Sequence, residues 1–541
     1  MEQPISLPEQ IALRARETPD RTAIREVDGY DYTCAQFWQL CNDWAGYLRG
    51  LGVGRGDTVL VLQPTSAQAL AIWMGLALLD AVEVPLNTQL RGSLLAHVVR
   101  DSGAKLAVVG DRYLDAVADL GADLGADLGA DLGRLDRIVV TGTASPAFTH
   151  AVAPHGVDVR AVDRVPHAPV RTWDFPREWD LACLLYTSGT TGPAKGVMVS
   201  WGQLFETTIG TGPERTLRQP WTVFYSPYPT FHISGKTPLY AAMLGGGSVV
   251  LRERFDTAAF WSDVRAYSCT FTLLIATTAN FVLRQPPRPD DQDNPLVGVL
   301  FSPWIQGVEE FRTRFGVEAY SVYNMTEISC PIVGGWDNGP IDPTVCGTAR
   351  PGFDLRIVDE HDREVPAGTP GELVIRTDRP WRLMSGYWGL DAATATAWRN
   401  QWFHTGDVFS VDEQGRYRYL DRNKDSIRRR GENISSTEVE AQALAHPAVE
   451  MAAAVAVPDP ISEQEVKLVV TRAADTTLTE EELHSFLSAR LPRFMVPRYV
   501  EFATALPRTP TAKIRKTELR AQGVTPSTWD SQAARRTAGA T

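Results

Sequence analysis

The chain has 541 residues, of which 44% are hydrophobic, so it is too long for a single core and should form at least two domains. A net charge of −12 argues against a nucleic-acid partner and against a polybasic membrane anchor. The longest apolar stretch, residues 69–79, is too short to span a bilayer, and residues 1–21 lack the apolar core of a secretory signal. Six scattered cysteines without metal-like spacing predict reduced, mostly buried thiols and therefore a cytoplasmic protein.

The first 180 residues alternate strand-like and helix-like patterns. Residues 58–62 read as a strand, residues 66–79 as a helix and residues 82–87 as a second strand. This βαβ rhythm predicts a parallel sheet flanked by helices. Residues 119–133 repeat Ala-Asp-Leu-Gly, a period that matches no solenoid unit, and glycine in every copy weakens a helix. We interpret the repeat as a surface connection to a strand at 138–140.

A glycine- and hydroxyl-rich stretch at 186–196, Tyr-Thr-Ser-Gly-Thr-Thr-Gly-Pro-Ala-Lys-Gly, follows a predicted buried strand at 181–185. Glycines let backbone N–H groups point inward, hydroxyls donate to phosphate oxygens, and a lysine supplies a mobile positive charge. The alternative is a flexible surface loop, but the combination of all three features favours phosphate binding, with a spacing unlike that of the P-loop. The predicted contacts are Thr187, Ser188, Gly189, Thr190, Thr191, Gly192 and Lys195.

This stretch closely resembles the phosphate loop of the adenylate-forming enzymes, which include acyl- and aryl-CoA ligases, adenylation domains of peptide synthetases, and luciferases. The chain is most similar to AMP-forming acyl-CoA ligases of the carnitine–CoA ligase type. The resemblance implies a multi-lobed α/β fold: an N-terminal region (1–421) of two α/β lobes plus a β-barrel-like lobe, a hinge (422–425) and a small mobile α+β C-terminal domain (426–522). Residues 523–541 are polar, small and weakly patterned, which predicts a disordered tail.

The same resemblance implies a pocket for the acid. His232 follows a strand-like run and matches the family histidine that borders the acid and the phosphates, although a lone loop histidine is more often plain surface. After the predicted strand at 296–302, family members usually have Gly-Gly-Ala-Pro against the adenine, whereas this chain has Ser-Pro-Trp-Ile. This departure alters the nucleotide contacts expected there. Ser302, Trp304 and Cys330 indicate a compact, apolar or aromatic pocket.

Residues 323–327 read Tyr-Asn-Met-Thr-Glu, at the place where the family has its second nucleotide motif. An aromatic ring can stack on adenine, a hydroxyl can bind the α-phosphate and a carboxylate can hold Mg²⁺. The resemblance therefore implies that Tyr323, Asn324, Met325 and Thr326 contact ATP and that Glu327 holds the metal. Asn324 stands where a glycine is common.

Short strands and Gly/Pro turns dominate residues 346–419, a pattern typical of an antiparallel or barrel-like subdomain. Asp407 lies in a turn near its end, and two carboxylate oxygens can accept from both hydroxyls of a ribose. The resemblance assigns Asp407 and Arg422 to the ribose, and Lys424 to the hinge about which the C-terminal domain rotates.

The C-terminal region carries two further matches. Residues 428–430 are three arginines, which are usually a solvated face but could meet the phosphates of CoA. Gly431 matches the tunnel of the CoA thiol, where many ligases have Gly-Gly and this chain has Arg-Gly. Lys513 matches the lysine that bridges the carboxylate and the α-phosphate and neutralises developing charge. The predicted catalytic residues are Lys513, Thr326 and His232.

These motifs predict an AMP-forming ligase that adenylates a carboxylic acid with ATP and Mg²⁺ and transfers it to CoA. The departures at Trp304 and Arg430 leave open another acceptor, such as a carrier protein, or an ATP-dependent diazotase that activates nitrite for an aryl amine. A non-enzymatic nucleotide-binding relative should have lost Lys513 or Glu327, and both are present. Nothing in the sequence supports a luciferase-like oxygenase. The expected partners are the acid and a small acceptor, without nucleic acid or a membrane span.

Overall fold

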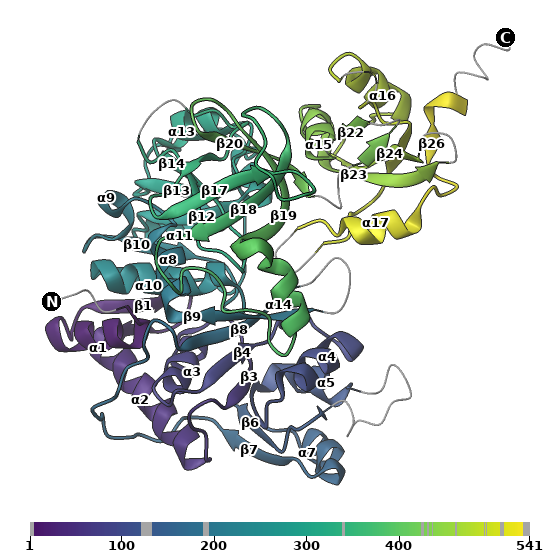
Figure 1. The fold of residues 1–541 in the computed structure, drawn as a ribbon. Coiled ribbons are helices and arrows are strands. Elements are labelled where there is room, and N and C mark those ends of the chain that lie inside the picture. Colours follow the sequence, from purple (N-terminus) through teal and green to yellow (C-terminus); the bar gives the residue numbers. More distant parts are fainter. Residues whose placement is uncertain are drawn as a thin grey trace. The chain divides into compact units, whose positions relative to one another are not determined.

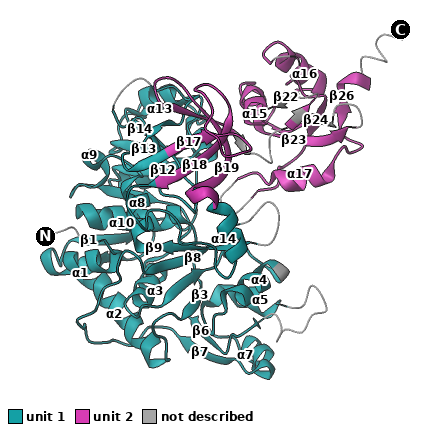
Figure 2. Ribbon diagram, in the orientation of Figure 1, with its two compact units in different colours: residues 1–354, 377–398 teal, residues 355–376, 399–541 magenta. Residues whose placement is uncertain are grey.

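The computed structural model describes residues 5–120, 132–187, 194–337, 341–422, 427–429, 432–434, 436–459, 463–491, 493, 495–508 and 513–533. The chain forms two compact units, residues 1–354 with 377–398 and residues 355–376 with 399–541, which Figure 2 colours separately. This division groups residues 355–376 and 399–421 with the C-terminal residues, whereas the sequence predicts a domain boundary at residue 421.

Seven strands of the first unit form a mostly parallel sheet with helices on both faces (Figure 1). Their order is β7 (Asp158–Val162), β6 (Arg137–Thr141), β5 (Leu106–Gly110), β3 (Thr58–Leu62), β4 (Val82–Pro85), β8 (Leu181–Thr187) and β9 (Lys195–Ser200). Neighbouring strands are parallel except β8 and β9, which are antiparallel. The βαβ prediction is confirmed, because α3 (Ala67–Ala77) connects the parallel strands β3 and β4.

The other strands of the first unit form a second sheet with a parallel centre. Their order is β16 (Gly347–Ala349), β15 (Ile332–Gly334), β14 (Glu318–Tyr323), β13 (Gly298–Ser302), β12 (Phe271–Ile275), β10 (Val223–Ser226), β11 (Ser248–Leu251), β1 (Thr22–Glu26) and β2 (Asp31–Thr33). Strands from β14 to β1 run parallel, and β15, β16 and β2 run antiparallel to their neighbours. The carboxyl ends of β10, β12, β13 and β14 therefore lie along one edge, where open α/β sheets bind ligands.

The helices of the first unit cover these sheets and supply much of their cores. They are α1 (Leu7–Glu17), α2 (Cys34–Gly50), α3, α4 (Gly92–Ser102), α5 (Leu114–Ala118), α7 (Pro146–Val152), α8 (Trp201–Ile209), α9 (Glu214–Leu217), α10 (Ile233–Gly245), α11 (Phe260–Ala266), α12 (Ala276–Leu283), α13 (Val308–Phe315) and α14 (Asp391–Ala397). α2 begins with a capping box. The Thr33 hydroxyl accepts from the Gln36 backbone N–H, and the Gln36 side-chain oxygen accepts from the Thr33 backbone N–H. α3 is buried over almost its whole length, which explains why its sequence is apolar on every face.

The second unit combines an antiparallel sheet with a small α+β domain. The antiparallel order is β17 (Phe353–Val358), β18 (Gly371–Thr377), β19 (Phe403–Val411) and β20 (Arg416–Arg422). The α+β part contains β21 (Ile427–Arg429), β22 (Glu432–Ile434), β23 (Val449–Asp459), β24 (Glu463–Arg472), β25 (Tyr499–Phe502), β26 (Trp529–Asp530), α15 (Ser436–Leu444), α16 (Glu480–Ser488) and α17 (Lys516–Gln522). Alternate residues of β23 enter two cores, with Ala452 and Ala454 in one and Met451, Ala453 and Val455 in the other.

Residues 523–533 differ from the predicted disordered tail. Strand β26 pairs antiparallel with β25, and Arg498 forms ion pairs with Asp459 at 2.8 Å and with Asp530 at 3.1 Å. Thr525 and Thr528 also donate to the Glu501 carboxylate. The polar composition misled the prediction because these residues are bound mainly through hydrogen bonds and ion pairs, together with Trp529, which packs against the core of the α+β part. Residues 534–541 and most of the Ala-Asp-Leu-Gly repeat lie outside the described residues.

All six cysteines are free thiols, five of them buried and Cys346 partly exposed, in agreement with the reduced thiols predicted. Among the residues that the structure describes, no helix is both long enough and apolar enough to cross a membrane.

Candidate active site

The flanks of the predicted phosphate loop are the facing ends of two strands. Thr187 ends β8 and Lys195 begins β9, and the two residues are paired in the antiparallel register. The predicted contacts Ser188, Gly189, Thr190, Thr191 and Gly192 lie outside the described residues. A loop between two paired residues has its ends anchored a strand spacing apart, so the hairpin presents Thr187 and Lys195 together.

The Tyr-Asn-Met-Thr-Glu segment begins at Tyr323, the last residue of β14, and three hydrogen bonds to its other residues hold it in place. The Gln203 side chain, on α8, donates to the Thr326 carbonyl at 2.8 Å. The Asn324 side chain accepts from the Cys330 backbone N–H at 3.0 Å, and the Met384 N–H donates to the Glu327 carbonyl at 2.9 Å. The segment is therefore fixed although only its first residue, Tyr323, belongs to a strand. Asn324, which stands where the family often has glycine, uses its side chain to shape the turn.

One tyrosine joins the two motifs. The Tyr387 hydroxyl donates to Glu327 Oε1 at 3.1 Å, and Lys195 Nζ lies 4.9 Å from the centroid of the Tyr387 ring. Burial, followed by the charge of Glu327, raises the pKa of Tyr387 far above its usual 10, so the phenol stays protonated as a donor. The Glu327 carboxylate is itself buried. The structure thus brings the loop lysine and the predicted metal ligand together. Sequence reasoning missed Tyr387.

A buried charge cluster supports this segment. Glu206 of α8 pairs with Arg350 at 3.3 Å and with Arg382 at 3.0 Å. Arg350 also donates to the Ser329 carbonyl at 2.6 Å and to the Cys330 carbonyl at 3.1 Å. All three charged side chains are more than nine-tenths buried, so each requires its partners. The cluster fixes the backbone that follows Glu327.

The residues predicted for the acid pocket follow the carboxyl ends of the parallel strands. Ser302 ends β13 next to β14, and half-buried His232 precedes α10, which comes after β10. Trp304 is largely buried and packs against Phe301 with ring centroids 5.9 Å apart, so most of its ring belongs to the core. Cys330 is also buried, and burial raises the pKa of its thiol to about 12, which makes the thiol unreactive.

The second unit holds the predicted ribose residue in a bonded strand. Asp407 of β19 is buried, and its backbone pairs with that of Arg422 in β20. Glu372 supports the preceding turn by accepting from His404 Nδ1 at 3.0 Å and from the Gly406 N–H at 2.9 Å. The Arg422 side chain, Lys424 and Gly431 lie outside what the structure describes.

Lys513 is exposed and precedes Ile514, which forms an isolated bridge with Arg508. A flexible, exposed lysine supplies a point charge that can reach a ligand.

Among the described residues, no group of three or more His, Cys, Asp or Glu side chains is arranged to hold a metal ion. Mg²⁺ at nucleotide sites takes one or two carboxylates together with phosphate oxygens and waters, so it needs no such group. A single buried carboxylate, Glu327, next to the flank of the phosphate loop fits this pattern. These residues can therefore hold a magnesium nucleotide.

Comparison with known proteins matches nearly the whole chain. The family model described as AMP-binding enzyme matches residues 11–388, and the model described as AMP-binding enzyme C-terminal domain matches residues 438–513. A crotonobetaine/carnitine–CoA ligase of Salmonella arizonae is 30% identical over 505 residues, which are 92% of this chain and 94% of the ligase. A ligase of the same description from Citrobacter koseri is 30% identical and covers 90% of this chain and 93% of its own.

Two solved structures show the same fold. ATP-bound MatB of Rhodopseudomonas palustris superposes with a TM-score of 0.80 at 24% identity, covering 95% of this chain and 98% of MatB. The amide bond synthetase McbA of Marinactinospora thermotolerans gives a TM-score of 0.78 at 23% identity, covering 96% and 100%. The chain therefore has a large N-terminal α/β domain with mixed sheets and a small C-terminal domain.

Proposed function

Since this chain belongs to the AMP-binding enzymes, as an AMP-forming acid–CoA ligase of that family, we propose that it uses MgATP to adenylate a carboxylic acid and then forms the CoA thioester. The observation that carries the proposal is the contact chain from Lys195 through Tyr387 to Glu327. It supports the proposal, because a magnesium nucleotide needs a carboxylate for the metal and a cation for the phosphates close to each other.

In the first half-reaction, an oxygen of the acid attacks the α-phosphorus of ATP and pyrophosphate leaves, giving an acyl-adenylate. Thr187, Lys195 and Thr326 bind phosphate oxygens, and Asp407 accepts from the ribose hydroxyls. Glu327 would hold Mg²⁺, which neutralises phosphate charge when bound. Lys513 adds positive charge where the acid meets the α-phosphate. Such a reaction asks mainly for positioning and charge neutralisation, because phosphoryl transfer needs little covalent help from the protein.

In the second half-reaction, the thiol sulfur of CoA attacks the acyl carbon, the thiol proton is lost and AMP leaves. Gly431 lines the path of the thiol, and Lys424 is the hinge residue between the two half-reactions. His232, Ser302, Trp304 and Cys330 border the acid. These roles rest on motif position, and the substitutions below test those of Gly431 and Lys513.

The deciding experiment measures pyrophosphate release from MgATP with fatty acids, aryl acids, carnitine, crotonobetaine and nitrite, each with and without CoA. We expect release with one class of carboxylic acid and a CoA thioester as product. Release with an acid but no thioester would move the proposal to another acceptor, and release with nitrite alone would indicate a diazotase. No release with any acid would refute the proposal.

Two variants separate the half-reactions. Lys513→Ala should abolish pyrophosphate release while ATP still binds, and Arg515→Ala, which removes an exposed charge from the Glu518 pair nearby, should release pyrophosphate normally. Gly431→Leu should slow thioester formation and spare adenylation. Normal release from Lys513→Ala, or equal loss of both half-reactions in Gly431→Leu, would contradict these roles.

A further inference from the structure

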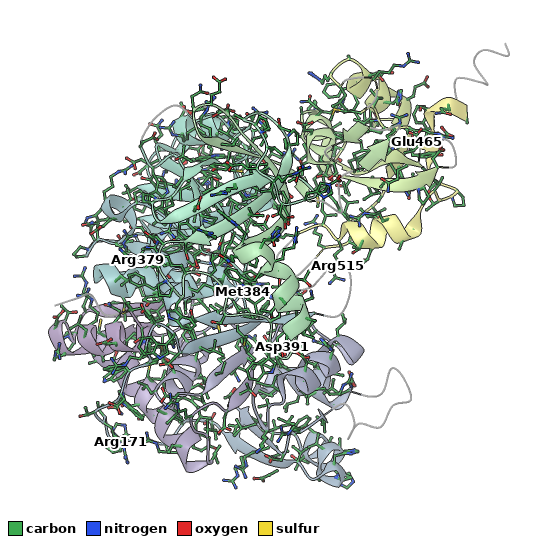
Figure 3. The ribbon with its side chains drawn as sticks, viewed as in Figure 1. Arg171, Arg379, Met384, Asp391, Glu465 and Arg515 are labelled. Carbon is green, nitrogen blue, oxygen red and sulfur yellow. The ribbon has the colours of Figure 1, made fainter. Side chains whose placement is uncertain are left out.

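The segment that carries Tyr387 is attached to the strand that begins with Lys195. The Met198 N–H donates to the Gly386 carbonyl at 2.9 Å, and the Trp388 N–H donates to the Gly196 carbonyl at 2.8 Å. Figure 3 labels Met384 and Asp391, which enclose this segment in the chain, with Asp391 at the start of α14. The backbone of Tyr387 is therefore bonded to β9, whose first residue is Lys195.

The backbone at this position is specialised. Gly386 has φ 142°, a conformation that L side chains rarely adopt, and a Cβ there would lie 3.0 Å from Met198 Cε. The Tyr387 N–H donates to Thr394 Oγ1 at 2.9 Å. The glycine lets the chain turn closely past β9, and the bond to α14 fixes the direction in which the tyrosine leaves the backbone.

The tyrosine then makes two different contacts with its two chemical parts. Its hydroxyl donates to Glu327 Oε1 at 3.1 Å, and its ring faces Lys195 Nζ at 4.9 Å from the centroid. A hydrogen bond to one oxygen sets the plane of a carboxylate, and a ring face attracts an ammonium without using its N–H donors. The contacts therefore orient a carboxylate and a cation while both keep their charge.

We propose that Tyr387 is a positioning residue of the magnesium nucleotide site, whose hydroxyl aims Glu327 at the metal and whose ring holds Lys195 ready for the phosphates. The proposal rests on the proposed function, because it assumes that Glu327 and Lys195 meet MgATP. It assigns separable effects to the hydroxyl and to the ring, and this separation distinguishes it from a role in packing alone.

The test measures ATP binding by isothermal titration calorimetry, once with excess EDTA and once with Mg²⁺. Tyr387→Phe keeps the ring and removes the hydroxyl, whereas Tyr387→Leu removes both. Tyr225→Phe is the matched control. The Tyr225 hydroxyl donates to the Asp263 carboxylate at 2.8 Å, so this variant removes a buried tyrosine–carboxylate hydrogen bond elsewhere in the same unit. Thermal unfolding of each variant checks that the fold is retained.

We expect Tyr387→Phe to bind metal-free ATP as tightly as the wild type. The factor by which Mg²⁺ increases ATP affinity should be about tenfold smaller in the variant, which is the effect of losing one hydrogen bond to a charged group. Tyr387→Leu should in addition bind metal-free ATP about threefold more weakly, the scale of an exposed cation–π contact. Tyr225→Phe should keep both affinities.

An undiminished magnesium gain in Tyr387→Phe would overturn the role of the hydroxyl. Equal metal-free affinities of Tyr387→Phe and Tyr387→Leu would overturn the role of the ring. Failure of the wild type to bind MgATP would refute the proposed function itself, so the two failures are distinguishable.

Discussion

Removing Arg350 should destabilise the first unit far more than removing an exposed arginine. Arg350 neutralises Glu206 at 3.3 Å and donates to three backbone carbonyls, those of Glu206, Ser329 and Cys330. In Arg350→Met, only Arg382 stays beside the buried Glu206 carboxylate, and all three carbonyls lose a donor. Removing one partner of a buried ion pair costs about 3 to 5 kcal/mol. Arg382 compensates only part of the Glu206 charge, and the three carbonyls left without a donor add to the cost.

This cost translates into a measurable melting shift. The unfolding entropy is about 2 cal/mol/K per residue, so a destabilisation of about 3 to 5 kcal/mol should lower the Tm of the first unit by roughly 4 to 6 °C. Differential scanning calorimetry at a fixed scan rate measures the shift. Arg312→Met is the control, since Arg312 forms an exposed pair with Glu309 that is worth about 0.5 kcal/mol or less. If both variants melt within 1 °C of each other, the cluster does not support the site as we argue.

Three further predictions follow from buried or paired groups. Burial raises the pKa of Glu372, but hydrogen bonds from His404 and a backbone N–H outweigh burial and hold this pKa below its usual 4.5. The Glu372→Gln variant should therefore melt at a lower temperature than the wild type at pH 7. The difference in Tm should shrink as the pH falls below 4.5, because the wild-type carboxylate is then protonated. Lys236→Met should lower the free energy of unfolding, measured by urea titration, by about 3 to 5 kcal/mol, because Glu83 stays buried without its cation. The double variant Lys236→Met/Glu83→Leu should recover most of that loss, and no recovery would contradict the argument. Because burial raises the pKa of the Cys183 and Cys330 thiols to about 12, both should resist a disulfide reagent at pH 8 in the folded protein and react after unfolding, as mass spectrometry of labelled peptides would detect.

The parts of the fold that periodicity encodes were predictable. Residues 58–62 form β3 with every side chain buried, and their continuous apolar run is typical of a central parallel strand. α16 begins at Glu480, directly after a capping box at Thr479, and ends at Ser488. The start was readable because a cap is a local hydrogen-bond pattern, whereas the end depends on where tertiary packing stops.

The site was predictable only where a motif is contiguous. Thr187 and Lys195 flank one loop, and Tyr323 to Glu327 form one segment, so local chemistry pointed to both. Tyr387 carries no such signal, because a lone tyrosine resembles any partly buried aromatic residue. The one local clue is Gly386, whose backbone conformation requires glycine, but only the structure shows that the resulting turn lies against β9.

Charges in otherwise apolar elements offer a signal that reaches across the sequence. Glu83 is the one charged residue of β4, where every position is buried, and Lys236 is the one charged residue of α10, buried from Gly235 to Leu244. An isolated buried charge costs several kcal/mol, so each element needs an opposite charge from elsewhere. Glu83 and Lys236 form an ion pair with each other, although 153 positions separate them in the chain. The same argument links Glu206, on a mostly buried α8, to the arginines beneath the site. Lone charges in apolar elements therefore predict long-range contacts that hydrophobic periodicity cannot reveal.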